Sequence, residues 1–323
     1  MDYLSKYSSD YSLLWGTFGD WLEAGTVLPK RTPQALTSTC AYFNYARILG
    51  DTAALLGKHE DAKKYRELAE AVQNSFNKRF LDPNTGLYAS DSQTAQALPL
   101  YFGMVPPEKK RLVLDQLVRN IKETRQNHLS TGIVGTLYLF YTLSDSGYSD
   151  LAYTLATQED CPGWWYMVRN GATTLWEAWD GVTLPSQNHP TFGCIGAWYY
   201  RNLAGIQPDP NAPGFKKIII KPAVVGDLTW VKASYESIYG TIASNWRIED
   251  DSFRLNVTIP VNTTATVYVP TKNTDSITES GKLVWKKGEF VKGAPGITDG
   301  RKVGEYVALD VGSGSYAFWL AGQ

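Results

Sequence analysis

The sequence contains few of the residues that mark metalloproteins and disulfide-bonded secreted proteins. Only three cysteines occur in 323 residues, Cys40, Cys161 and Cys194, and no spacing between them matches a metal-binding motif. Such an odd, widely spaced set predicts free thiols rather than a disulfide framework, and hence a reducing, cytoplasmic compartment. Histidine is equally scarce, with three residues. Neither a metal site nor a cofactor is expected.

Long apolar runs and an excess of one charge are also missing. No apolar run approaches the roughly 18 residues that a membrane span requires, and residues 1–10 are polar, unlike a signal peptide. Lysine and arginine total 31 against 32 for aspartate and glutamate, so no basic surface for nucleic acid is indicated. Phosphate loops, nucleophile elbows and dinucleotide fingerprints do not occur. Membrane and nucleic-acid partners are therefore not expected.

Tryptophan, in contrast, is abundant, with 11 residues. In the most informative stretch, Glu177 lies between Trp176 and Trp179, and His189 follows twelve residues after the glutamate. The apolar faces of sugar rings pack on indole, their hydroxyls need directional hydrogen bonds, and a suitably placed carboxylate transfers protons. This pattern favours a carbohydrate site with Glu177 as its acid–base residue. The alternative is an ordinary glutamate in a salt bridge.

Residues 1–207 have the pattern of helices joined by short loops, with no strands between them. Thr32 is the expected N-cap of the first long helix, with Pro33 at the first helical position. The expected helices cover about residues 33–50, 60–80, 93–104, 108–121, 133–143, 150–158 and 196–203. Pairs of such helices predict the stacked hairpins of an (α/α)6 toroid. A closed toroid of six hairpins needs about twelve helices, so this one is predicted to be incomplete at its N-terminus.

A proline-rich segment beginning at Pro208 marks the expected boundary to a second domain, residues 208–323. Short β-branched or alternating runs follow, broken by Gly, Asn and Asp. They cover residues 217–221, 229–234, 240–248, 253–259, 263–269, 282–285, 306–311 and 316–320. This pattern predicts an antiparallel β-sandwich. Its expected role is to cover one side of the helical domain, with sugar binding as the alternative.

Several short motifs occur in the order in which one known family carries them. They are Phe-Gly-Asp-Trp-Leu (18–22), Ser-Gln-Thr-Ala-Gln-Ala-Leu (92–98), Thr-Gly-Ile-Val-Gly-Thr (131–136), Pro-Gly-Trp-Trp-Tyr-Met (162–167), Gly-Ala-Thr-Thr-Leu-Trp-Glu-Ala-Trp-Asp (171–180), Ser-Gln-Asn-His (186–189), Phe-Gly (192–193) and Ala-Pro-Gly-Phe (212–215). In these motifs the chain resembles the carboxyl half of bacterial α-L-rhamnosidases of glycoside hydrolase family 78. The resemblance covers essentially all 323 residues. It implies an (α/α)6 barrel followed by a β-sandwich, and hydrolysis of terminal α-linked L-rhamnose with inversion.

The resemblance also implies roles for individual residues. Glu177 matches the general base of the family, and His189, Trp21 and Trp176 match positions that contact the sugar. The chain departs from the family pattern at Ala178, where arginine is usual. An L-rhamnoside is accordingly the expected substrate.

Three further residues have two possible roles each. Asp20 either bonds sugar hydroxyls or is a buried helix-capping carboxylate. Trp164 either lines the mouth of the site or packs between hairpins. Asp180 either orients Glu177 or caps the turn that follows it. The sequence leaves these alternatives open.

Inverting hydrolysis needs a second carboxyl group about 6.5–9.5 Å from the first, so that a water molecule fits between base and sugar. By the resemblance, the general acid belongs to an Arg-Asp-Glu segment upstream of the Phe-Gly-Asp-Trp motif. Only 17 residues precede Phe18, and no Arg-Asp-Glu occurs. We therefore expect the carboxyl portion of a longer enzyme, weak or inactive by itself. A dimer partner or the missing N-terminal portion would cover the open face of the toroid.

Two other functions stay open. The first is a catalytically silent remnant that binds sugar or assembles with a partner chain, which the missing acid favours. The second is a toroid enzyme of another specificity, such as an unsaturated glucuronyl hydrolase or a polysaccharide lyase. A lyase needs a Tyr/His or Tyr/Arg pair beside a uronate-binding cation. The Trp-Glu-Ala-Trp segment offers no such cluster, so this function ranks third.

Overall fold

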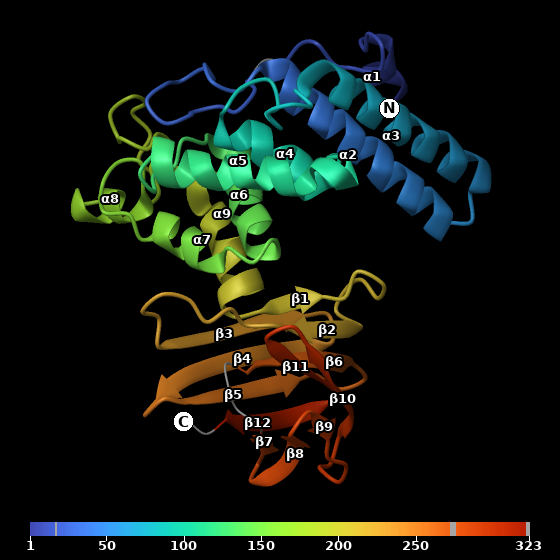
Figure 1. The fold of residues 1–323 in the computed structure, drawn as a ribbon, viewed down its shortest axis with the longest axis vertical. Helices are drawn as coiled ribbons and strands as arrows, with labels where there is room; N and C mark the ends of the chain where they lie inside the picture. Colours follow the sequence, from blue (N-terminus) through green and yellow to red (C-terminus); the bar gives the residue numbers. More distant parts are fainter. Residues whose placement is uncertain (17, 272–275, 321–323) are drawn as a thin grey trace. The chain divides into compact units, whose positions relative to one another are not determined.

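The computed structural model describes residues 1–16, 18–271 and 276–320 (Figure 1). The chain forms two compact units, Met1–Ile195 and Gly196–Gln323. Helices and loops make up the first unit, and two β-sheets dominate the second (Figure 1). The predicted order, helical hairpins followed by an antiparallel β-sandwich, is confirmed. None of the described helices combines the length and the apolar character that crossing a membrane would require.

The first unit is built mainly from three helical hairpins, α2–α3, α4–α5 and α6–α7. The helices and helical turns of the chain are α1 (Asp2–Lys6), α2 (Gln34–Leu55), α3 (His59–Phe80), α4 (Gln93–Phe102), η1 (Pro107–Lys109), α5 (Lys110–Arg119), η2 (Asn120–Thr124), α6 (Ile133–Asp145), α7 (Ser149–Ala156), α8 (Trp164–Arg169), η3 (Thr191–Gly193), α9 (Cys194–Trp198) and η4 (Tyr199–Leu203). The seven expected helices are present, whereas α1 and α8 were not anticipated.

Local sequence signals fixed some helix ends and not others. At the start of α4 the Ser92 hydroxyl accepts a hydrogen bond from Ala95 N at 3.1 Å, which makes Ser92 the N-cap of this helix. The prediction of Thr32 as the N-cap of α2 is wrong, because Pro33 holds that position. The Thr32 amide instead donates to Glu23 Oε1 at 2.8 Å. The Thr32 hydroxyl, which would have to accept a helix amide in a cap, lies 2.9 Å from the Ser92 hydroxyl.

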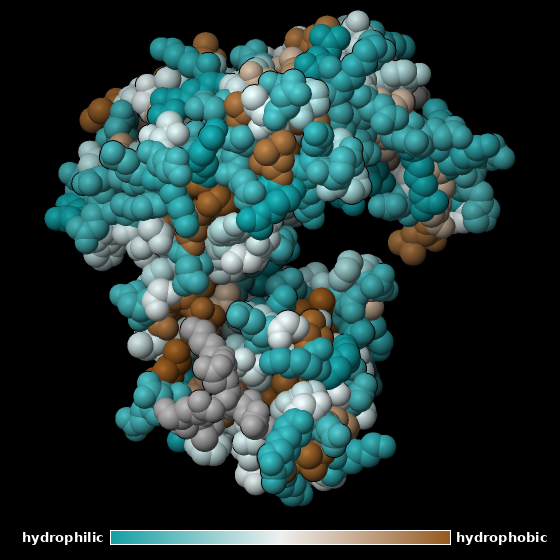
Figure 2. Space-filling model, in the orientation of Figure 1, coloured by the Kyte–Doolittle hydropathy of each residue, from teal (hydrophilic) through white to brown (hydrophobic). Residues whose placement is uncertain are grey.

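One face of the hairpins carries exposed aromatic side chains. Tyr45 of α2 and Tyr101 of α4 are exposed, and the Tyr101 ring lies 4.9 Å from that of Tyr138 of α6. Tyr45 and Tyr138 also line a hollow of about 350 Å³. A second apolar patch lies at the free end of the α2–α3 hairpin, where Leu55 and Leu56 are exposed (Figure 2). Apolar surface of this kind is typical of an interface.

The second unit consists of a five-stranded sheet, in the order β1-β2-β6-β11-β10, and a seven-stranded sheet, in the order β3-β4-β5-β12-β7-β8-β9. The strands are β1 (Ile206–Pro208), β2 (Lys217–Ile220), β3 (Trp230–Ser237), β4 (Gly240–Glu249), β5 (Ser252–Ile259), β6 (Thr264–Pro270), β7 (Ser276–Glu279), β8 (Lys282–Lys286), β9 (Glu289–Phe290), β10 (Ile297–Val303), β11 (Tyr306–Val311) and β12 (Gly314–Leu320). Only β2 and β6 pair in parallel among the described strands. The inner faces of both sheets share one apolar core.

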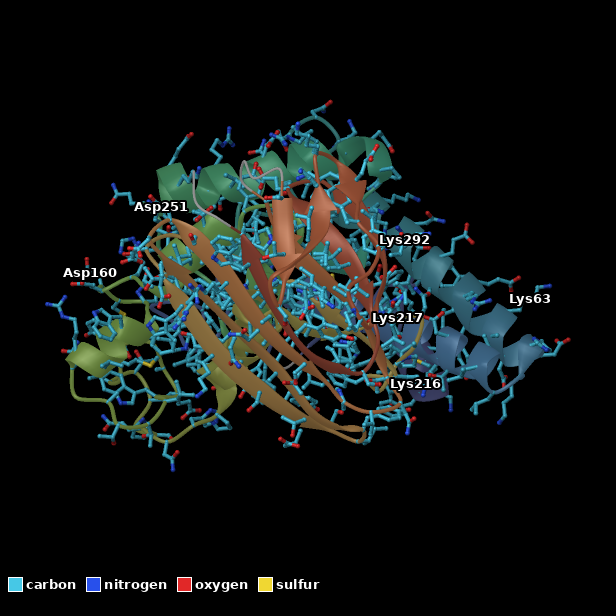
Figure 3. All side chains as sticks on the ribbon, turned by 90° about the horizontal axis from the view of Figure 1, so that it is seen from below. Lys63, Asp160, Lys216, Lys217, Asp251 and Lys292 are labelled. Carbon is cyan, nitrogen blue, oxygen red and sulfur yellow. The ribbon has the colours of Figure 1, made fainter. Side chains whose placement is uncertain are left out.

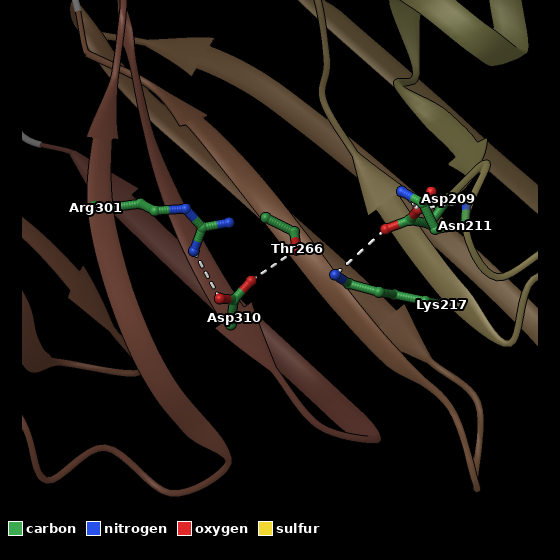
Figure 4. A network of polar contacts seen from close by, with 6 residues as sticks. All are labelled: Asp209, Asn211, Lys217, Thr266, Arg301 and Asp310. Atoms are coloured by element: carbon green, nitrogen blue, oxygen red, sulfur yellow. Dashed lines mark hydrogen bonds and ion pairs between the residues drawn. The ribbon is translucent and has the colours of Figure 1, made fainter.

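A network of polar contacts spans the outer face of the five-stranded sheet (Figure 4). Asp310 of β11 accepts a hydrogen bond from the Thr266 hydroxyl at 2.7 Å and pairs with Arg301 Nη1 at 2.6 Å. Partial burial raises the pKa of Asp310, but the hydrogen bond from Thr266 and the charge of Arg301 outweigh it, so the net shift is downward. Lys217 Nζ pairs with Asp209 Oδ2 at 3.3 Å in the same network.

Replacing Asp310 by alanine is expected to lower the free energy of unfolding by about 1 kcal/mol, because a partly exposed ion pair and one hydroxyl bond are lost. Since the folded pKa lies below the ordinary value, this contribution is present at neutral pH and disappears as the pH falls through the folded pKa. Urea unfolding at pH 7 and at pH 3 measures both effects. Glu249→Ala is the control, because its 3.1 Å pair with Arg247 is half exposed and should contribute less. Equal losses for the two variants at pH 7 would contradict the prediction.

Candidate active site

The residues around Glu177 form a short hydrogen-bonded ladder outside the regular strands. Glu177 N donates to Ser186 O at 3.0 Å, and His189 N donates to Leu175 O at 2.8 Å. The Thr174 hydroxyl donates to the Gln187 carbonyl. The two arms of the ladder, residues 174–177 and 186–189, thus run side by side. They bring together the two residues that the sequence pattern singled out twelve positions apart.

A tight turn closes the ladder. Asp180 Oδ1 accepts from Val182 N at 3.0 Å and from Thr183 N at 2.9 Å, and Asp180 Oδ2 accepts from the Thr183 hydroxyl at 2.5 Å. Partial burial raises the pKa of Asp180, but these hydrogen bonds outweigh it and the net shift is downward. Asp180 is therefore ionised at neutral pH and caps the turn. Of its two predicted roles, this geometry is that of the cap.

The Glu177 carboxylate faces His189 across a small gap. The His189 Nε2 and Glu177 Oε1 atoms are 3.9 Å apart, with 34% and 21% of the two side chains exposed. The other ring nitrogen, His189 Nδ1, lies 2.7 Å from the Thr191 hydroxyl, which orients the imidazole. Among the described residues, no hydrogen bond reaches the Glu177 carboxylate. A water molecule or a sugar hydroxyl can therefore approach both side chains.

The two indoles next to Glu177 in the sequence, Trp176 and Trp179, are both buried. Trp179 is buried, stacks on Phe192 with ring centroids 3.7 Å apart, and donates its indole N–H to Thr131 O at 3.0 Å. Trp176 is also buried, and Gly181 packs against its ring so closely that a Cβ atom there would overlap it. The indoles do not seal Glu177 from solvent, because one fifth of the glutamate side chain is exposed. Trp176 therefore has a packing role and does not offer an exposed ring face to a ligand.

Trp164 belongs to the same buried aromatic cluster. Its ring lies edge-on to Trp179 with centroids 5.1 Å apart, and its indole N–H donates to Phe192 O at 2.9 Å. Because the ring is buried and its one polar atom is already bonded, the geometry at Trp164 is that of packing, the second of its two expected roles, and not that of a sugar contact.

Asp20 is fully buried, and its two oxygens accept four hydrogen bonds. Oδ1 accepts from Val134 N at 3.0 Å and Gly135 N at 2.8 Å, while Oδ2 accepts from Gly132 N at 2.8 Å and from the Thr94 hydroxyl. A carboxylate has about four acceptor sites, so none remains for a sugar hydroxyl. Asp20 caps the N-terminus of α6, so of its two expected roles the geometry is that of the buried cap and not that of a contact with sugar.

Trp21 is partly exposed and keeps a surface for a ligand. Its ring meets that of Phe18 edge-on, with centroids 5.0 Å apart, and Phe18 itself is exposed. The Trp21 carbonyl accepts from Ile133 N at 2.8 Å. Trp179 donates to Thr131 O, two residues before Ile133. Residues 131–133 therefore hold both Trp21 and the turn that follows Glu177.

Sequence reasoning missed one buried acid in this region, Glu23. Its Oε2 accepts from Lys30 N and Arg31 N, each at 2.9 Å, and Oε1 accepts from Thr32 N. The negative charge of Glu23 adds to the upward shift of the Asp20 pKa, which burial chiefly causes. The side chain shapes the loop that follows Trp21. No spacing or motif marks it, because all three partners are backbone amides.

Residues 1–203, more than half of the chain, match the family described as the bacterial alpha-L-rhamnosidase six-hairpin glycosidase domain. The chain belongs to the bacterial alpha-L-rhamnosidase family. Residues 205–283 match the C-terminal domain of the same rhamnosidases. The predicted family is confirmed.

Solved rhamnosidase structures share the fold. An alpha-L-rhamnosidase from Dictyoglumus thermophilum superimposes with a TM-score of 0.90 at 36% identity, over 98% of this chain and 35% of that protein. The Streptomyces avermitilis alpha-L-rhamnosidase, in a crystal structure with L-rhamnose, gives a TM-score of 0.87 at 31% identity.

Among curated relatives, an alpha-L-rhamnosidase from Streptomyces avermitilis is 31% identical over 98% of this chain. One from Formosa agariphila is 33% identical over 84% of this chain. The chain spans about 30% of the length of these rhamnosidases, 29% of the first and 30% of the second.

Proposed function

We propose that this chain carries the general-base side of an inverting glycoside hydrolase that releases terminal α-linked L-rhamnose. The observation that supports the proposal is the Glu177 carboxylate, open to solvent and 3.9 Å from the His189 ring on a hydrogen-bonded ladder. Glu177 removes a proton from a water molecule as the water oxygen bonds to the anomeric carbon and the bond to the leaving oxygen breaks. His189 donates from Nε2 to a sugar hydroxyl, and Trp21 offers a ring face to the sugar.

The leaving oxygen needs a proton from a second acid, and neither nearby candidate suits this role. All acceptor sites of Asp20 already hold hydrogen bonds, from three backbone amides at the start of α6 and from the Thr94 hydroxyl. Asp180 has a lowered pKa and is held in its turn. We therefore propose that this chain alone hydrolyses only rhamnosides whose leaving group departs without protonation.

Two aryl α-L-rhamnosides that differ only in leaving group test this proposal. The 2,4-dinitrophenolate anion departs unprotonated, whereas the phenolate of a phenyl glycoside needs acid assistance. We expect measurable turnover of the dinitrophenyl rhamnoside above the enzyme-free rate and none of the phenyl rhamnoside. Turnover of both substrates at similar rates would mean that the chain supplies its own acid. Failure to hydrolyse either substrate would remove Glu177 as a working base.

A second candidate function is a silent chain that binds sugar and assembles with a partner. The exposed aromatic face formed by Tyr45 and Tyr101 favours it, because such surface is usually covered. Calorimetric titration with L-rhamnose and a solution mass measurement distinguish the two functions. Binding of L-rhamnose without turnover of the dinitrophenyl substrate, in a chain that self-associates, would favour this second function.

A further inference from the structure

The outer face of the seven-stranded sheet carries an ordered row of tryptophan and arginine side chains. The strand registers pair Trp230 with Arg247, Arg247 with Arg254, and Arg254 with Trp319 across β3, β4, β5 and β12. Residues directly opposite each other point to the same face of a sheet. Trp230 is 64% exposed and Trp319 is 39% exposed. Two indoles therefore flank two guanidinium groups on the solvent side.

The neighbouring row on the same face is rich in hydrogen-bonding groups. Lys232 pairs with Asn245, and Asn245 pairs with Asn256. Asn245 Oδ1 accepts from Ala233 N at 3.2 Å, which leaves the amide NH2 group of this side chain to donate outward. Side chains of both rows line a hollow of about 520 Å³: Trp230, Lys232, Asn245, Arg247 and Asn256. The face is thus concave and polar around an open indole.

The charge of this face is positive at its centre. Lys232, Arg247 and Arg254 lie on this face, and Glu249 Oε1 lies 3.1 Å from Arg247 Nη1. Among the described residues, the guanidinium group of Arg254 has no ion-pair or hydrogen-bond partner. Further acids lie at the ends of the strands. Asp251 is at the β4–β5 turn (Figure 3).

Glu236 lies towards the other end of β3, and its carboxylate accepts from the Thr241 hydroxyl at 2.7 Å. The central rows therefore carry an excess of positive charge that suits an anionic ligand.

We propose that this outer face of β3, β4, β5 and β12 binds an acidic oligosaccharide, a short chain of pyranose rings that bears carboxylates. The indoles of Trp230 and Trp319 stack on sugar rings. Arg247 and Arg254 bind carboxylates through paired N–H donors, and the asparagine amides bond to hydroxyls. The row crosses three inter-strand steps, about 14 Å at ~4.8 Å per step, which suits an oligosaccharide better than a single sugar.

Isothermal titration with tetragalacturonic acid, and with cellotetraose as a neutral sugar of equal length, tests the proposal. We expect the acidic tetrasaccharide to bind at least about tenfold more tightly than the neutral one, and its affinity to fall with added salt. Trp230→Ala and Arg254→Gln should each weaken it by about tenfold. Both residues are exposed, so neither change should disturb folding, which circular dichroism checks.

Two matched variants control for loss of an aromatic ring and loss of a charge. Tyr235→Ala removes a 42% exposed ring from β3, but on the opposite face of that strand. Lys63→Gln removes an exposed charge on α3, within the other unit (Figure 3). Neither change should alter the affinity for tetragalacturonic acid. His189→Ala should also leave it unchanged, because His189 belongs to the other unit.

Several results would overturn the proposal. One is the absence of binding of either tetrasaccharide at millimolar concentration. Another is a Trp230→Ala affinity equal to that of the unsubstituted chain. A third is inorganic polyphosphate binding as tightly as the acidic sugar, which would mean that charge alone is recognised. Equal affinity for the neutral and acidic tetrasaccharides would contradict the role given to Arg247 and Arg254.

Discussion

Glu177→Gln is expected to lower the turnover of 2,4-dinitrophenyl α-L-rhamnoside by roughly 10²–10⁴-fold, the usual contribution of a positioned general base. Glutamine keeps the shape of the side chain and its contact with solvent, but an amide cannot accept the proton of the attacking water. The affinity for L-rhamnose should change little, because the ladder that holds this position uses backbone atoms. Steady-state kinetics and titration with L-rhamnose measure the two quantities separately.

Sodium azide provides a second measurement on the same variant. The azide anion attacks without losing a proton, so it should bypass the missing base and restore part of the rate, releasing the aryloxide and forming a rhamnosyl azide of inverted configuration. Asp180→Asn is the matched control, since it changes a neighbouring carboxylate that caps a turn and should lower turnover far less. A Glu177→Gln rate equal to that of the unsubstituted chain would exclude Glu177 as the base.

Asp20→Ala is expected to destabilise the helical unit by at least about 3 kcal/mol. The change leaves three backbone amides at the start of α6 without an acceptor, and a buried unsatisfied amide costs about 1–3 kcal/mol. Asp20→Asn should also destabilise the helical unit, because its side-chain NH2 group is a donor and cannot accept hydrogen bonds from the backbone N–H groups of α6. Denaturant unfolding, followed by the helical circular dichroism signal, measures the loss. Asp180→Ala, at a partly exposed turn, should cost much less, and equal losses would contradict this account.

The pH dependence of stability carries a further signature of Asp20. Burial raises the pKa of Asp20 to about 6, in spite of the hydrogen bonds from Thr94, Gly132 and Gly135. The folded chain then binds more protons than the unfolded chain between about pH 4 and pH 6. By linkage, the Asp20 contribution to stability falls as the pH rises through this window and is constant above it. In Asp20→Asn this part of the pH dependence should vanish.

Regular periodicity allowed most of the fold to be predicted from the sequence. The apolar positions of α3 lie on one face, where Val72 and Phe76 are buried, and β11 has the predicted bounds. The missed strands β1, β7, β9 and β10 are short or polar on one side, and β10 is defined by its pairing with β11 rather than by its composition. The amino-acid composition of a short segment does not show that it pairs with a strand elsewhere in the chain.

Prediction of the site was less complete, for a related reason. The pattern identified Glu177 and His189, which the ladder does bring together. It could not tell an indole that faces a ligand from one that packs in the core, because Trp164 and Trp21 differ in burial and not in sequence type. It could not assign Asp20 either, because the amides that saturate its carboxylate lie more than one hundred residues later in the chain.

The capping of α6 by Asp20 links the order of synthesis to the order of folding. The hydrogen bond from Gly132 spans 112 positions, so closing that loop costs about 4 kcal/mol of chain entropy beyond the constant term. During synthesis on a ribosome, Asp20 emerges long before α6. Until α6 is made, the Asp20 carboxylate has no backbone amides of that helix to bond with. A circularly permuted gene that placed residue 20 last would reverse this order of events. The first turn of α6 would then stay frayed until translation ended.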